Sequence, residues 1–253
     1  GGVANTKGIA YWDISANAWT ALGTGMGGDV EPLRTLEFKP GGNLYIGGRF
    51  TGADGAGNGD YICMWDGSNF SALGDTELSS DVIDIKFDKN GILYATGAFL
   101  NAGDDSNADY VAIFKNNSWR ALGTGFDAIG YSINFIGNDM YVGGYFVSVG
   151  EITTSNGLAI WKNGVWFPLD ADLDTGYQDT IYVVMKASDD SIYFGGDFTG
   201  TSYVCDQKTV TNNGNALIYP VIEVKGPGIL QSIINSTTGK TIVFEGLTII
   251  TSS

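Results

Sequence analysis

Histidine is absent from all 253 residues of this sequence. The absence excludes nucleophiles that depend on a histidine base, imidazole acid-base catalysis, and zinc or copper sites held by histidine. Only carboxylate or hydroxyl chemistry would remain for an enzyme. We therefore assign no catalytic residue from the sequence.

Cysteine is almost as scarce, since Cys63 and Cys205 are the two copies. They occupy matching places in a repeated pattern, because YIC at 61–63 resembles YVC at 203–205. Residues at matching sites of separate repeats usually lie too far apart for a disulfide. We expect two buried free thiols, with a disulfide as the alternative.

Charged residues are also few, at 16% of the chain, and acidic residues outnumber basic ones by 28 to 13. The net charge of −15 opposes nucleic-acid phosphates and anionic lipid, so neither is an expected partner. No apolar run approaches the roughly 18 residues of a membrane span, so no membrane insertion is expected. The apolar fraction of 43% is enough for a sizeable core.

Glycine, in contrast, is abundant at 38 copies against 5 prolines. Tight turns between short strands need the positive φ that glycine supplies. Long amphipathic helical patterns are absent. The composition favours an all-β protein.

A pattern of about fifty residues occurs four times. Its first half contains IAYWD at 9–13 and WTALG at 19–23, and its second half contains LYIGGRF at 44–50. This period is typical of a four-stranded propeller blade. The four units lie near residues 9–50, 61–99, 111–146 and 158–198.

Each unit contains four short apolar runs bounded by turn residues, which predicts four strands. In the second unit we expect these strands at 61–65, 70–73, 82–87 and 93–99, paired within the unit into one antiparallel sheet. A single sheet cannot bury both faces, so the sheets should stack around an axis. The prediction is a β-propeller with four visible blades.

Two kinds of residue recur at fixed places in the unit. All six tryptophans fall on two sites, which we interpret as packing positions between blades, with ligand stacking as the alternative. Glycine pairs inside a strand indicate close approach of neighbouring backbones. The pairs are Gly47-Gly48, Gly143-Gly144 and Gly195-Gly196, with Thr96-Gly97 as a variant.

A strand ending in Gly-Gly, then an aromatic residue with Asp, then Trp-x-x-Leu, resembles the kelch-type propeller repeat over residues 1–203. The Asp occurs at Asp13 and Asp66 but is Lys115 and Lys162 in the other units. The copper radical oxidases of that family use histidine ligands that have no counterpart here. Residues 1–12 align with 150–161, which follow a Gly-Gly strand, so we expect further blades upstream and a ring of five or more.

The repeat ends after Phe198, and residues 204–216 have the composition of a linker. Residues 217–253 form a second all-β segment, with an alternating strand at 221–225, further strands at 229–234 and 241–250, and a turn at 235–240. YPVIEVKGPG at 219–228, followed by NSTTGKTIVF at 235–244, is similar to the C-terminal β-sandwich of siphophage-type distal tail proteins over about 215–250. The resemblance implies a phage or phage-derived tail component.

One position varies while its surroundings stay nearly constant. Between the glycine pair and the following phenylalanine stand Arg49, Ala98, Tyr145 and Asp197 in successive units. Because the scaffold does not dictate this side chain, we hypothesise that Arg49, Tyr145 and Asp197 contact a ligand at a common funnel. Drift at a tolerant site is the alternative.

Acidic segments give a second candidate. Asp170, Asp172 and Asp174, followed by Gly176, resemble a calcium loop, because a hard cation binds several carboxylates within one turn. The solvent-facing side of a strand is the alternative. The loops at 54–60 and 101–109 are solvated connections or a rim for sugar or Ca²⁺.

The leading interpretation is a non-enzymatic subunit of a phage tail or tail-like particle, located on the virion tail or outside the cell. Its propeller would bind a host-surface glycan or protein, its C-terminal β segment would contact other particle subunits, and the chain would form a homo-oligomer without a required cofactor. The alternatives are a secreted or surface-anchored bacterial carbohydrate-binding propeller and a carboxylate-dependent glycosidase or lyase.

Overall fold

The computed structural model describes residues 6–27, 32–53, 59–75, 78–152, 155–169, 180–188 and 191–197, and four short strands between 228 and 249. The chain divides into two compact units, Gly1–Cys205 and Asp206–Ser253. Calcium candidates Asp170, Asp172 and Asp174 lie outside the described residues, as do Cys205 and the 204–216 linker.

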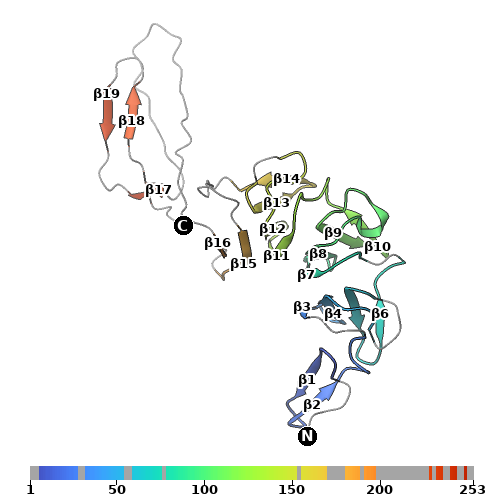
Figure 1. Cartoon of the computed structure of the whole chain (residues 1–253). Helices are drawn as coiled ribbons and strands as arrows, with labels where there is room; N and C mark the ends of the chain where they lie inside the picture. The colour runs from blue at the N-terminus through green and yellow to red at the C-terminus, as the bar shows by residue number, and fades with distance from the viewer. Residues whose placement is uncertain are drawn as a thin grey trace. The chain divides into compact units, whose positions relative to one another are not determined.

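The first unit consists of small antiparallel sheets (Figure 1). Apart from one 3-10 turn, η1 (Ala102–Asp104), every regular element among its described residues is a strand. The all-β prediction is confirmed. Three sheets have four strands in sequence order: β3 (Leu33–Phe38), β4 (Leu44–Gly48), β5 (Ile62–Trp65) and β6 (Phe70–Ala72); β7 (Val82–Phe87), β8 (Leu93–Gly97), β9 (Val111–Lys115) and β10 (Ser118–Ala121); β11 (Gly130–Ile136), β12 (Asp139–Gly144), β13 (Leu158–Lys162) and β14 (Val165–Pro168).

Two hairpins complete the unit. The first is β1 (Ala10–Asp13) with β2 (Ala18–Ala21), and the second is β15 (Thr180–Lys186) with β16 (Ile192–Asp197). By their place in the repeat, β1 and β2 correspond to the third and fourth strands of a complete sheet. Strands β15 and β16 correspond to the first and second.

The predicted grouping of strands into sheets is wrong in one respect. The runs expected at 61–65 and 70–73 do not pair with those at 82–87 and 93–99. Instead β5 pairs with β4, with Leu44 opposite Trp65 and Ile46 opposite Cys63, so each sheet joins the second half of one unit to the first half of the next. A repeat determines the period but not the point at which one sheet ends and the next begins.

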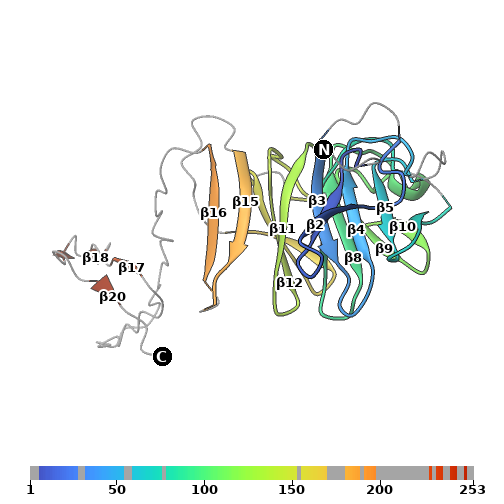
Figure 2. The same ribbon diagram turned by 90° about the horizontal axis from the view of Figure 1, so that it is seen from below.

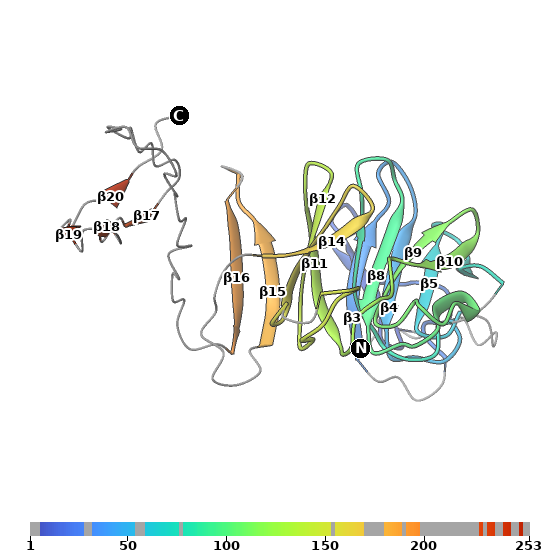
Figure 3. The same cartoon turned by 90° about the horizontal axis from the view of Figure 1, so that it is seen from above.

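The first strands of successive sheets are neighbours: β3 contacts β7, β7 contacts β11, and β11 contacts β15. Figure 1 shows the four strands in this order, and Figures 2 and 3 show β15 beside β11 at one end of the series. Between the sheets lie apolar side chains, such as the fully buried Ile85 and Ile133. The sheets therefore bury their faces against one another, as the stacking prediction requires.

The recurrent aromatic residues pair across the third and fourth strands of each sheet. The ring centroids of Trp161 and Trp166 lie 4.9 Å apart, and those of Phe114 and Trp119 lie 5.0 Å apart. Trp119 and Trp166 are buried within clusters that draw on two neighbouring sheets. The packing interpretation is confirmed for these two residues.

The two members of each glycine pair make room for different neighbours. A Cβ on Gly48 would lie 2.8 Å from Leu33 Cα in its own sheet. A Cβ on Gly47 would lie 2.7 Å from Val82 Cγ1 in the next sheet. The second glycine thus accommodates backbone and the first accommodates the neighbouring sheet.

The Thr96 variant has its own compensation. Thr96 is fully buried and its hydroxyl donates to the Tyr110 carbonyl at 2.7 Å. The facing residue of the next sheet is Gly130, where a Cβ would collide with the Thr96 hydroxyl. At this contact between sheets the glycine is therefore on the first strand, at Gly130, and the larger residue is on the second strand, at Thr96.

Cys63 is a fully buried free thiol on β5, as predicted. Its apolar surroundings disfavour the thiolate and raise its pKa to about 12.

In the second unit, β17 (Gly228–Ile229) pairs with β20 (Thr248–Ile249), and β18 (Ser232–Asn235) pairs with β19 (Lys240–Val243). Strands β18 and β19 lie where the sequence predicts strands on either side of a turn. Residues 217–227 lie outside the described part, and a β-sandwich stays a prediction.

Candidate functional site

Each of the four described first strands, β3, β7, β11 and β15, has a β-bulge near its start. The register shifts between Leu33 and Thr35 in β3, and at the matching place in β7, β11 and β15. A bulge adds one residue and can re-aim its side chain, which is why bulges often border functional sites. The added residues are Arg34, Ile83, Tyr131 and Tyr182.

Because the first strands are neighbours, these residues gather at one end of the stacked sheets. The variable residues that follow the second strands lie at the same end, since Arg49 N–H donates to the Pro32 carbonyl and Tyr145 N–H donates to the Ile129 carbonyl. We call this end the bulge edge. It comprises Arg34, Arg49, Asp81, Ile83, Ala98, Tyr131, Tyr145, Tyr182 and Asp197.

Two arginines of the bulge edge meet one carboxylate. Arg34 Nη2 lies 3.6 Å from Asp81 Oδ2, and Arg49 Nε lies 3.5 Å from Asp81 Oδ1. The arginine side chains are about half exposed, whereas that of Asp81 is only 14% exposed. Such pairs add little stability at a surface, but they orient planar guanidinium groups that can bind oxygen atoms of a ligand.

Three tyrosines form the other part of the bulge edge. The ring centroids of Tyr131 and Tyr182 lie 5.2 Å apart at an angle of 48°. Tyr182 is 51% exposed and Tyr145 is 40% exposed. Burial raises the pKa of Tyr131 above its usual value of 10.0, and the neighbouring Tyr182 and Tyr145 raise it further. The cluster presents aromatic surface and hydroxyl groups to solvent.

Hydrogen bonds between sheets hold the strands just beyond the bulges. Asp84 Oδ2 accepts the Ile133 N–H at 2.8 Å, and its Oδ1 accepts the Thr35 hydroxyl at 3.1 Å. Asp84 therefore connects three successive sheets. The pattern recurs where Ser132 Oγ accepts the Val184 N–H at 3.1 Å.

Asp84 is also electrostatically perturbed. Burial raises its pKa above the usual 3.8, and the bond from the Ile133 N–H opposes that rise most strongly. With three backbone or hydroxyl donors already on this carboxylate, its arrangement is that of a structural link.

The three residues selected from the sequence lie at equivalent ends of their sheets. Arg49 pairs with Asp81, Tyr145 borders the tyrosine cluster, and Asp197 is exposed at the end of β16, opposite Thr180. Sequence reasoning missed the four bulge residues. The available signal was the same kind of variation, Arg, Ile, Tyr and Tyr, at one matching place of the repeat.

Among the described residues there is no group of three or more Cys, Asp or Glu side chains positioned to hold a metal ion. In the 101–109 loop, carboxylates organise the loop itself. Asp109 Oδ1 accepts the Asn101 N–H at 2.8 Å, and Asp105 Oδ2 accepts the Ala121 N–H at 3.1 Å.

Neither a family model nor a curated protein matches this sequence. The kelch-type and tail-protein resemblances therefore stay predictions. Of the part of the chain that the structure describes, no helix has the length and apolar character to cross a membrane. What the fold and the bulge edge define is an all-β protein of stacked antiparallel sheets with an aromatic and arginine-rich end.

Proposed function

We propose that this protein is a non-enzymatic recognition subunit that binds a cell-surface glycan at the bulge edge. The observation that carries the proposal is the tyrosine cluster, in which Tyr131 and Tyr182 lie on adjacent first strands, Tyr145 follows β12, and Tyr145 and Tyr182 are exposed. Tyrosine rings pack against the apolar face of a sugar while their hydroxyl groups remain available for hydrogen bonds.

The arginines complete the chemistry that a glycan requires. Arg34 and Arg49 present donors that suit sugar hydroxyl or carboxylate oxygens. With a chain charge of −15, these guanidinium groups supply local positive charge beside the rings. An acidic sugar is therefore a better candidate than a polyanion with repeated phosphates, which the overall charge would repel.

The proposal extends to the setting of the protein. The stacked sheets would be blades of a kelch-like β-propeller, and the second unit would attach the protein to a phage tail or tail-like particle. Support for this step comes from the fifty-residue repeat, from the neighbouring first strands, and from the similarity of residues 215–250 to tail-protein segments. Particle and host would then be the partners.

A glycan array probed with the whole chain tests the binding. Bound glycans should lose affinity about tenfold with Tyr182→Ala, equivalent to about 1.4 kcal/mol. Phe167→Ala is the matched control, because Phe167 is an exposed aromatic residue on the outer strand β14.

The sequence-based site is tested by substituting Arg49, Tyr145 and Asp197 together by alanine. Loss of glycan binding supports the bulge edge as the site. Unchanged binding in both this variant and Tyr182→Ala would refute it, and release of free sugar from the array ligands would indicate an enzyme instead.

A further inference from the structure

Among the residues that the structure describes, β16 has no partner on one edge and no sheet against one face. In complete sheets the second strand pairs on both sides, as β4 does with β3 and β5, but β16 pairs only with β15 among the described strands. A Cβ on Gly143 would meet Ile181 Cγ2 at 2.5 Å, whereas one on the equivalent Gly195 would meet nothing nearer than Val183 Cβ at 3.8 Å. Among the described residues, no neighbouring sheet faces Gly195.

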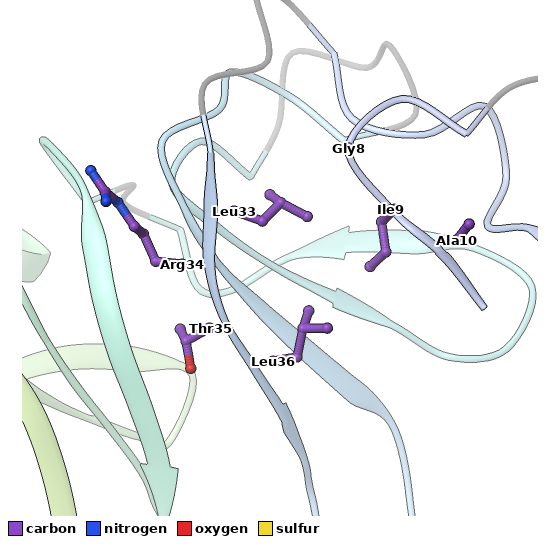
Figure 4. Close-up of a pocket in the computed structure, with 7 residues that line it drawn as sticks. All are labelled: Gly8, Ile9, Ala10, Leu33, Arg34, Thr35 and Leu36. Carbon is purple, nitrogen blue, oxygen red and sulfur yellow. The ribbon is translucent and has the colours of Figure 1, made fainter. Parts of the chain in front are cut away.

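The complementary opening lies between β1 and β3. Strand β1 pairs only with β2 among the described strands, and Leu36 on β3 is 53% exposed although its equivalent, Ile85, is 0% exposed. The space is a groove between the edge of β1 and the face of β3 (Figure 4). Its lining residues are Gly8, Ile9, Ala10, Leu33, Arg34, Thr35 and Leu36.

Within the described part of the chain, the groove beside β1 lacks a second strand, and β16 is a second strand that lacks a neighbouring third strand. In a complete sheet, the place of the groove is filled by a second strand whose glycine faces the first strand of the next sheet. Strand β16 is a second strand of this kind, and no described sheet packs on its Gly195. Each hairpin is half of the four-stranded pattern, β15 and β16 being the first half and β1 and β2 the second.

We propose that β16 of one copy of this chain inserts into the β1–β3 groove of a second copy. The result is a composite sheet in the order β15–β16 from one copy and β1–β2 from the other. A second copy is the occupant because β1 and β16 belong to opposite ends of the stacked sheets within one chain, separated by three complete sheets (Figure 1).

The repeat determines the register of the composite sheet. Leu44 and Tyr45 lie opposite Trp65 and Met64, and Met140 and Tyr141 lie opposite Trp161 and Ile160. By equivalence Ile192 pairs with Trp12 and Tyr193 pairs with Tyr11 of the other copy. Gly195 then covers Leu36, and β15 lies beside β3, which brings Tyr182 next to Arg34 of the second copy.

Two such contacts can close a ring of two copies. A head-to-tail interface gives a ring when its rotation closes and a filament when it does not. Two copies would contain eight four-stranded sheets, three complete ones from each and two composite ones, and propellers reach about eight blades. This interface rests on strand pairing and does not require glycan binding, although it would join Tyr182 and Arg34 of the bulge edge.

Crosslinking between two chains that each carry one introduced cysteine tests whether β16 of a second copy fills the groove. One chain carries Tyr11→Cys and the other Tyr193→Cys, both in a Cys205→Ser background, and a short bis-maleimide is added. Both tyrosines are exposed, and the buried Cys63 thiol should not react. The inference predicts a crosslinked heterodimer from the mixture.

A third chain that carries both substitutions distinguishes the other outcomes. A crosslink that forms only within this chain would show that the chain closes on itself, and the absence of any crosslink would show that β16 does not fill the groove. Either result overturns the inference.

Light scattering with variants gives the second readout. The whole chain should have the mass of two copies, and Gly195→Val should reduce it to one copy without unfolding the protein. Gly42→Val is the matched control, because a Cβ there meets nothing within 4 Å in the β3–β4 turn. A dimer that survives Gly195→Val with unchanged dissociation on dilution would contradict the proposed interface.

Discussion

The interior junctions of the first unit and its two open ends are built from the same repeated residues, but the residues have different surroundings. Trp119 is 1% exposed and Trp19, at the same place in the repeat, is 57% exposed. A Cβ on Gly143 would press against the fully buried Ile181, whereas a Cβ on its equivalent Gly195 would meet, among the described residues, only Val183 of its own hairpin at 3.8 Å. The comparison shows that the energetic role of a repeated residue is determined by the sheet that packs against it.

The tryptophan pair should show the largest difference. Trp119→Ala removes a side chain packed between two sheets and should lower the free energy of unfolding by about 3–5 kcal/mol. Trp19→Ala loses mainly its edge contact with Trp12 at 5.4 Å and should cost about 1 kcal/mol. Urea unfolding of both variants at high dilution, where copies are dissociated, measures this difference, and equal costs would mean that the end at β1 and β2 is not open.

The glycine pair should show a smaller difference. Gly143→Ala forces a methyl group against Ile181 and should cost about 1–3 kcal/mol. Gly195→Ala should stay within about 0.5 kcal/mol of the parent when unfolding is followed at high dilution. A large loss at Gly195 under those conditions would place a neighbour of the same chain on β16.

The smallest effect concerns two aspartates with opposite pH dependence. Burial raises the pKa of Asp84, so the folded state binds a proton more tightly than the unfolded state, and stability should fall as pH rises from 3.8 through the raised pKa. Hydrogen bonds from the Asn69 and Ser68 N–H groups lower the pKa of the exposed Asp66, so its contribution is lost as pH falls through the lowered pKa.

Thermal unfolding between acidic and neutral pH checks these signs. Asp84→Asn should remove a decrease in stability with rising pH, and Asp66→Asn should remove an increase. The same sign for both variants would contradict the assigned surroundings.

Much of the fold follows from local sequence signals. The runs at 82–87 and 93–99 correspond to β7 and β8, and the turn between them is stabilised by Asp88 Oδ1, which accepts the Asn90 N–H at 2.9 Å. Such features depend on a few adjacent residues. Alternating apolar residues and turn chemistry are enough to predict them.

Features that depend on pairing between distant segments could not be predicted in the same way. The period was evident, but the boundary of each sheet depends on whether β5 and β6 join the strands before them, as they do, or the strands after them. The bulges at Arg34 and Tyr131 depend on a cross-strand register that leaves no local signal. The candidate position of Arg49 and Tyr145 was found by its variation, but its tyrosine and aspartate neighbours required the stacking of sheets.

The central claim is that first strands from different repeats lie side by side and bring their bulge residues together. Nuclear Overhauser contacts between the ring protons of Tyr131 and Tyr182, assigned with Tyr182→Phe in a tyrosine-labelled chain, test it most directly. With ring centroids 5.2 Å apart, the account predicts strong cross-peaks. A folded protein in which these two rings show no contact would contradict it.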